Sequence, residues 1–199
     1  MELTSTEHAI ILGTLLGDGF LQKRAKKARL RICHSVKQKE YVDWKYQQLI
    51  RLCQRTSLPQ TKTVRFGVTY SFTTQSEKIL LKYYSLFYKH GLKIIRSQLI
   101  DVFKDPLSLA IWWLDDGNAR LDAGRLATQA FRLAEHKILQ QLLLQNFNIQ
   151  TNIVKHSALK KQYYLYIPNQ YFSELVDLIH IYVQPISTMQ YKLRKPRND

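Results

Sequence analysis

Hydrophobic and polar positions follow one order twice along the chain. In the first half, residues 28–34 alternate in character, residues 37–53 carry apolar side chains at helical spacing, and residues 61–73 alternate again around Gly67. Ser76 is expected to cap the next helix and Gly91 to end it. The predicted elements are strands at 20–24 and 28–34, a helix at 37–53, two strands within 61–73 and a helix at 76–89.

The second half repeats this order more loosely. Its predicted elements are a strand-like segment at 118–131, a helix at 135–147, a hairpin of 149–156 and 162–167, and a helix at 171–183. A helical turn near 94–103 is expected to end at Asp105-Pro106. We therefore predict an α+β protein with halves at 1–90 and 107–184, a linker at 91–106 and a basic tail at 185–199, either solvated or in contact with phosphates.

Two apolar segments begin the halves, and both end in Asp-Gly. The first is ILGTLLGDG at residues 11–19 and the second is LAIWWLDDG at residues 109–117. Their final acids, Asp18 and Asp116, are 98 positions apart in a chain of 199 residues. This spacing predicts an internal duplication.

Each apolar segment is predicted to be a helix with a carboxylate at its C-terminal end. The helix dipole disfavours negative charge there, so Asp18 and Asp116 should need a cation nearby. Gly19 and Gly117 fit the left-handed residue that closes many helices. Carboxylate and carbonyl oxygens at such a tip are the ligands that Mg²⁺ prefers. For either segment alone, an ordinary buried helix followed by an Asp-Gly turn is the alternative.

Small residues on the first segment would let the two helices cross closely. Gly13 and Gly17 lie four positions apart on one helix face, which leaves a smooth strip for a second helix. Such a crossing would make Asp18 and Asp116 neighbours. Two acidic tips that hold divalent ions are arranged for two-metal hydrolysis of a phosphodiester.

Composition narrows the partners. The chain has 30 Lys and Arg against 15 Asp and Glu, a net charge of +15, which favours a polyanion because each added cation releases counterions from dense phosphates. Cys33 and Cys53 are too few for a disulfide framework and form no CxxC pattern, so a reducing compartment is expected. The longest apolar run, Ala9–Leu16, is far below the roughly 20 residues that cross a bilayer, and residues 1–4 lack the basic start of a signal peptide.

The paired segments resemble the motifs of the LAGLIDADG homing endonucleases, in the single-chain form with two motif copies, and the resemblance covers nearly the whole chain. The first copy keeps Gly13, Asp18 and Gly19 at the family's positions. The second keeps Leu109, Ala110, Asp116 and Gly117. Each copy is followed by the family's ββαββα pattern. The resemblance implies a monomer whose two four-stranded antiparallel sheets form a saddle in the major groove of double-stranded DNA, with the motif helices packed between them.

The second copy departs from the family pattern. Ile111 replaces the interfacial glycine, Asp115 replaces the small residue before the acid, and Trp112-Trp113 are bulky. The side chains of the second copy therefore disfavour close helix contact on that side. Asp115 is expected to contribute its carbonyl rather than its side chain to a metal.

The resemblance also implies the chemistry. Asp18 and Asp116 would coordinate Mg²⁺ with help from the carbonyls of Gly17 and Asp115, and each site would hydrolyse one strand through a metal-activated water. Mn²⁺ is expected to substitute, and Ca²⁺ to support binding without cleavage. The side chains expected to orient water, with a solvated surface role as the alternative for each, are Lys37, Gln38, Gln129 and Lys161.

Polar faces of the predicted strands are the candidate DNA surface. Arginine pairs with guanine, and glutamine or asparagine with adenine, in the major groove, whereas Lys23, Lys26 and Lys27 are expected to contact phosphates. A merely solvated sheet face is the alternative. The residues expected at DNA are Lys23, Arg24, Lys26, Lys27, Arg29, Arg31, Thr63, Arg65, Thr69, Ser71 and Thr73 in the first half, and Arg120, Arg125, Gln150, Asn152, His156, Tyr164 and Tyr166 in the second.

Two other functions stay open. An RNA maturase that assists group I intron splicing could use the same scaffold, although A-form RNA has a major groove too narrow for strands. A DNA-binding regulator without catalysis is the second, but such a protein would be expected to lack one of the two acids. The sequence shows no targeting peptide and leaves bacterial cytoplasm and organelle equally open.

Overall fold

The first half of the chain forms a four-stranded antiparallel sheet. In the computed structural model, which describes residues 2–193 except 55–57, 121–122, 158 and 160, the sheet has the order β1-β2-β4-β3. Helices α1, α2 and α3 contact its strands. The bounds are α1 (Ser5–Leu16), β1 (Phe20–Arg24), β2 (Lys27–Ser35), α2 (Lys39–Gln48), β3 (Gln60–Val64), β4 (Gly67–Thr73) and α3 (Leu81–Phe87).

The second half repeats this topology. Its sheet has the corresponding order β7-β8-β10-β9 and is also antiparallel. A small hairpin and a short helix connect the halves. The bounds are β5 (Tyr88–Lys89), β6 (Leu92–Lys93), α4 (Gln98–Val102), α5 (Pro106–Asp116), β7 (Gly117–Arg120), β8 (Ala123–Leu126), α6 (Leu133–Phe147), β9 (Asn152–Ser157), β10 (Gln162–Ile167) and α7 (Asn169–Val183).

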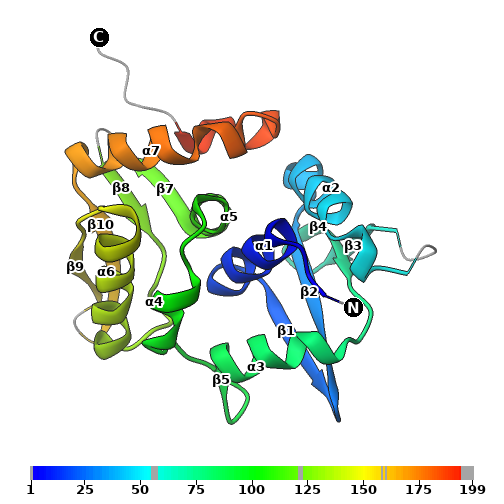
Figure 1. The fold of residues 1–199 in the computed structure, drawn as a ribbon. Helices are drawn as coiled ribbons and strands as arrows, with labels where there is room; N and C mark the ends of the chain where they lie inside the picture. Colours follow the sequence, from blue (N-terminus) through cyan, green and yellow to red (C-terminus); the bar gives the residue numbers. More distant parts are fainter. Residues whose placement is uncertain (1, 55–57, 121–122, 158, 160, 194–199) are drawn as a thin grey trace.

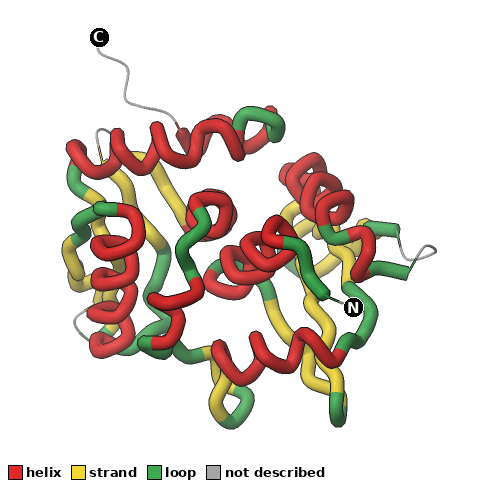
Figure 2. The backbone as a smooth tube through the Cα atoms, viewed as in Figure 1, coloured by secondary structure: helices red, strands yellow, loops and turns green. Residues whose placement is uncertain are grey.

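Helices α1 and α5 lie side by side at the centre of the molecule, with one sheet on either side (Figure 1). The strands of the two four-stranded sheets form separate groups on either side of this pair (Figure 2). Both helices are buried along nearly their whole length. The central helix pair therefore joins the two halves and is also the main apolar core between them.

Gly13 of α1 and Gly17 directly after it create the close contact. A Cβ atom at Gly13 would lie 2.4 Å from the backbone oxygen of Ser108, and one at Gly17 would lie 2.5 Å from the Cβ of Asp115. Ile111 packs directly over Gly13. The expected crossing is thus confirmed, because glycines on α1 alone provide the space that bulky residues on α5 require.

A C-terminal segment crosses back to the first half. The 3₁₀ turns of Ser187–Leu193 follow α7, and the carboxylate of Glu40 in α2 accepts hydrogen bonds from the backbone N–H groups of Ser187 and Thr188 and from the Ser187 hydroxyl. Residues 185–193 of the expected basic tail are therefore docked. The remaining tail residues, 194–199, lie outside the described residues.

Most predicted elements are present, with three corrections. The helix expected at 76–89 is shorter, because Glu77 forms an antiparallel bridge with Ala28 that keeps its backbone extended, and Tyr88 already belongs to a strand. Residues 118–131 contain a hairpin rather than one strand-like segment. Gly19 and Gly117 do not have positive φ; each instead leaves no room for a Cβ, which would meet Thr14 or Trp113 within 2.3 Å.

No helix among the described residues is long and apolar enough to span a membrane. The apolar core instead runs continuously through both halves. Trp112 and Trp113 are completely buried in it, Trp112 against Phe103 after α4 and Trp113 against Phe172 of α7. Both tryptophans are therefore core residues.

Candidate active site at the helix tips

The C-terminal ends of α1 and α5 bring two acidic residues to one place. Asp18 follows the last turn of α1, and Asp116 is the final residue of α5. Burial raises the pKa of both carboxyls, and nearby acids add to the rise: chiefly Asp115 for Asp18, and Asp18 then Asp115 for Asp116, whose pKa reaches about 7. The ionised form of each carboxyl is therefore disfavoured, first by burial and then by the neighbouring acids.

Two lysines contact the backbone at the tips in equivalent ways. Lys93 Nζ donates to the carbonyl oxygens of Gly17 and Gly19, each at 2.9 Å, so it spans Asp18. Lys192 Nζ donates to the carbonyl oxygens of Asp115 at 3.4 Å and Gly117 at 2.7 Å, so it spans Asp116. Burial lowers the pKa of both lysines, while the surrounding aspartates oppose this. These are the cations that the helix dipole argument requires.

Neither lysine was predicted as a site residue, although the duplication contains a signal for them. Lys93 and Lys192 are 99 positions apart, almost the 98 that separate Asp18 and Asp116. Each follows the last helix of its half. Applying the repeat spacing to lysines as well as to the motif would have paired them.

Asp115 lies in the interface between the helices, not at the open tip. Its carboxylate accepts hydrogen bonds from Tyr41 Oη and Lys45 Nζ, both at 2.8 Å, and its side chain is fully buried. Burial alone would raise the pKa of Asp115, but Lys45 and then His34 hold it below its ordinary value. This ion pair between the halves could not be read from the sequence.

His34 of β2 lies between two of the acids. Its Nδ1 is 3.6 Å from Asp18 Oδ2, and its Nε2 is 3.7 Å from Asp115 Oδ1. Burial and then Lys45 lower the pKa of His34 to about 4, so the imidazole is neutral at pH 7. Ligand atoms of Asp18, His34 and Asp115 lie within 4.8 Å of one another and could hold a cation.

The predicted water-orienting residues lie in four different places. Gln38, after β2, interacts with the His34 side chain beside Asp18. Lys37 is exposed in the same turn. Gln129 lies in the turn after β8, and Lys161 is in the turn between β9 and β10 with a positive φ of 48°. Of the four, only Gln38 is placed near the tips by a described interaction.

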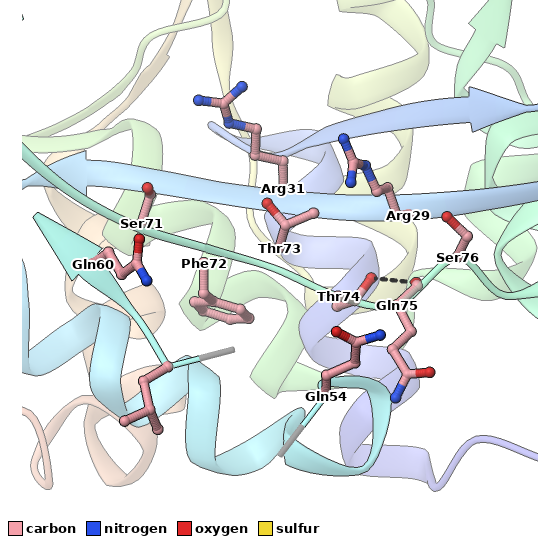
Figure 3. A pocket seen from close by; sticks show the side chains of 11 residues that line it. Arg29, Arg31, Gln54, Gln60, Ser71, Phe72, Thr73, Thr74, Gln75 and Ser76 are labelled. Atoms are coloured by element: carbon pink, nitrogen blue, oxygen red, sulfur yellow. Dashed lines mark hydrogen bonds between the residues drawn. The ribbon is translucent and has the colours of Figure 1, made fainter. Parts of the chain in front are cut away.

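The outer face of the first sheet is polar and strongly basic. Arg29, Arg31, Ser71 and Thr73 point to one side of the sheet, whereas Phe72 points to the other (Figure 3). Arg29 Nε donates to Gln22 Oε1 at 2.8 Å, which orients its guanidinium. Other predicted contacts here are the exposed Arg24, Lys26 and Lys27 and the half-buried Thr69. Lys23, also exposed, lies over the ring of Tyr84.

One predicted face is wrong in the first sheet. Thr63 pairs with Val68, and Lys62 pairs with Thr69. Because paired residues share a face and neighbours alternate, Thr63 lies on the side of Tyr70, and Lys62 and Gln60 take its place on the polar face. The two-residue turn of Arg65 and Phe66 shifts the alternation, which the sequence pattern did not register.

The second sheet presents a face richer in tyrosine. Tyr164 and Tyr166 share it with Arg125 and Asn152. The Arg125 guanidinium lies 4.1 Å from the centre of the Tyr164 ring and contacts His156 Nδ1 at 3.4 Å. This face continues to Asp116 and Lys192 as one hollow. Gln150 lies before β9 and bonds Tyr171, and the side chain of Arg120 lies outside the described ones.

The fold and the tips define a duplicated α+β protein in which each half supplies one acid and the segment after the last helix of each half supplies one lysine. The LAGLIDADG DNA endonuclease family matches residues 8–175, and the chain belongs to this family. It is 30% identical over 193 residues to the cytochrome b mRNA maturase bI2 of Debaryomyces hansenii, a match that covers 92% of this chain and 72% of the relative.

Solved structures share the architecture. The homing endonuclease I-WcaI bound to its DNA recognition sequence aligns with a TM-score of 0.86 at 24% identity, over 99% of this chain and 89% of that chain. I-DmoI in complex with DNA and Ca aligns with a TM-score of 0.51 at 16% identity, over 89% of this chain and 88% of that chain. At these identities the likeness establishes the fold.

Proposed function

We propose that the chain is a site-specific double-strand DNA endonuclease that hydrolyses one phosphodiester in each strand, with divalent ions held by Asp18 and Asp116. The observation that carries this proposal is the pair of carboxylates on adjacent helix tips, close enough that Asp18 adds to the rise in the pKa of Asp116. Membership of a family of DNA endonucleases supports it.

The donor set fits a hard divalent cation. Two carboxylates and the carbonyl oxygens of Gly17 and Asp115 offer oxygen ligands, which Mg²⁺ prefers, and Mn²⁺ accepts the same set. Burial and the neighbouring acids disfavour the ionised forms of Asp18 and Asp116, and a divalent ion would stabilise those forms. A bound ion supplies Lewis-acid stabilisation of the charge that develops on a phosphate.

The protein's own groups would position the DNA and balance charge. Lys93 and Lys192 place ammonium groups beside the tips, where a phosphate must approach. The neutral His34 beside Asp18 can hold a water molecule through a ring nitrogen. On either side, the two polar sheet faces would follow the major groove, as double-stranded DNA with a long target site requires of a single chain.

Cleavage of a plasmid tests this function. We expect a plasmid that carries a target site selected from a randomised library to be cut in both strands with Mg²⁺ or Mn²⁺. Asp18→Asn and Asp116→Asn should abolish cutting, because each removes a charged metal ligand, while binding measured in Ca²⁺ persists. Cut ends sequenced from a library of randomised sites would identify the target. Full cutting by either variant would refute the role of that acid.

Splicing assistance is the second candidate, because the maturase bI2 is 30% identical over 92% of this chain. We expect group I intron RNA to discriminate the two functions. If the chain is a maturase, it will accelerate splicing of that RNA, and Asp18→Asn will leave the acceleration intact. A protein that binds DNA in Ca²⁺ but cuts none with Mg²⁺ would instead be a regulator.

A further inference from the structure

The two acids at the tips are held by different means. α1 ends at Leu16, and Asp18 lies two residues beyond it. The neighbours of Asp18 complete the helix end: the Gly17 N–H donates to Gly13 O, and the Gly19 N–H donates to Thr14 O. The Asp18 N–H instead donates across the interface to Asp115 Oδ2 at 3.2 Å. The backbone at the first acid is therefore anchored by a side chain of the other half.

The second acid is held within its own half. Asp116 is the last residue of α5, so its N–H belongs to the helical ladder. Its carbonyl accepts from the Ala127 N–H at 3.0 Å. The position in α1 that corresponds to Asp115 is Gly17, which has no side chain to reach across. The anchoring is thus one-sided.

Asp115 is itself fixed from the first half. Its Oδ1 receives hydrogen bonds from Tyr41 and Lys45, both on α2 and both buried, while Oδ2 is directed to Asp18. Both carboxylate oxygens therefore have defined partners. Gly17 is what allows Asp115 to lie this close, because a Cβ at that position would be 2.7 Å from Asp115 Oδ2.

We propose that Asp115 is a positioning residue for Asp18, oriented by Lys45 and Tyr41, so that cleavage of one DNA strand depends on this buried group and cleavage of the other does not. This inference rests on the proposed nuclease function. It predicts that the two strand cuts can be separated without changing either acid.

Two double variants distinguish a role of Asp115 in positioning Asp18 from a role in stabilising the fold alone. Asp115→Asn with Lys45→Met removes the ion pair but keeps an oxygen to accept the Asp18 N–H, while the amide NH₂ donates to Tyr41 Oη. Asp115→Ala with Lys45→Met removes the same charges and also the acceptor. If Asp115 serves only to balance Lys45, the two variants will behave alike.

The readout is the ratio of the rate constants for cutting each strand of the selected target, measured with end-labelled DNA. We expect the alanine double variant to cut one strand about tenfold more slowly, since small misplacements of reacting groups carry costs of this order, and to accumulate nicked DNA. The asparagine double variant should keep the wild-type ratio. Equal slowing of both strands in the alanine variant would overturn the inference. Binding in Ca²⁺ and the melting temperature report whether each variant is folded.

Amide hydrogen exchange of Asp18 provides a measurement that needs no cleavage. The Asp18 N–H should be protected in the wild type and in the asparagine variant, and at least tenfold less protected in the alanine variant. Unchanged protection in the alanine variant would overturn the inference. If the wild type cuts no DNA but protection follows this order, the nuclease proposal fails and the positioning of Asp18 by Asp115 stands.

Discussion

The two halves of the molecule share a strand order but complete their helix tips differently. At each tip a lysine spans the acid, yet the first tip takes its backbone anchor from Asp115 of the other half, whereas the second is held by its own helix. The basic sheet face also differs, with oriented arginine on the first sheet and arginine stacked on tyrosine on the second. The acids and lysines at the tips are therefore the same in the two halves. The backbone anchoring of the tips and the side chains on the sheet faces differ between the halves.

The largest expected effect concerns the buried link between the halves. Lys45→Met leaves Asp115 buried without its cation, so we expect the free energy of unfolding to fall by about 3–5 kcal/mol. Urea denaturation measures it. Lys39→Met is the matched control, because the Lys39–Asp43 pair is largely exposed and should contribute less than about 1 kcal/mol. Equal losses of unfolding free energy in the two variants would show that the buried Lys45–Asp115 pair stabilises the protein no more than an exposed ion pair does.

The next largest effect is the pH dependence of stability that Asp116 and Asp18 contribute when no metal is bound. The folded-state pKa of Asp116, raised to about 7, exceeds its unfolded value, so ionising it on going from pH 5 to 8 destabilises the folded protein. We expect Asp116→Asn to match the wild type in unfolding free energy near pH 5 and to exceed it near pH 8, in chelator. Asp18→Asn should show the same sign with a smaller change, since the Asp18 side chain is 50% exposed.

Magnesium sharpens this test of the tips. Because a bound cation compensates the charge of Asp116, added Mg²⁺ should stabilise the wild type at pH 8 and reduce its difference from Asp116→Asn. A difference that is independent of pH, or insensitive to Mg²⁺, would mean that Asp116 is neither strained by its neighbours nor a metal ligand.

The smallest expected effect compares the sheet faces. Arg29→Ala and Arg125→Ala should each relax base preference at one position, in opposite halves of the target site, by about 1–3 kcal/mol. Sequencing of cut ends from a randomised library measures it. Lys26→Ala is the control, since loss of a phosphate contact weakens all sequences alike and lowers the salt slope by about one. Relaxation by both arginines in the same half-site would contradict the saddle arrangement.

Much of this architecture could be predicted from local pattern. The two motif copies predicted the duplication, and period-two alternation predicted the hairpins. Each of these signals lies within a short run of consecutive residues. Contacts between distant segments were missed. Lys45 has the sequence context of a solvated helical lysine, and only the arrival of Asp115, 70 positions away, explains its burial. Thr63 was misplaced because a two-residue turn reverses the alternation.

The glycines show the same limit. Gly19 and Gly117 were expected to adopt left-handed backbone conformations, but they are required for space beside Thr14 and Trp113. A glycine in a sequence can be required either by its backbone dihedral angles or by a close neighbouring atom, and the sequence alone does not distinguish these two reasons. At Gly13 and Gly17 the neighbour was identified correctly, because a second helix was already expected there.

The docking of Ser187–Leu193 on Glu40 has a consequence for synthesis on the ribosome. Both acids and Lys93 are translated long before Lys192, whose backbone carbonyl also accepts the Trp113 indole N–H. A nascent polypeptide that has emerged only through α7 therefore carries an incomplete second tip. The second tip is therefore completed last, when Ser187–Leu193 packs against α2 and places the Lys192 ammonium group beside Asp116.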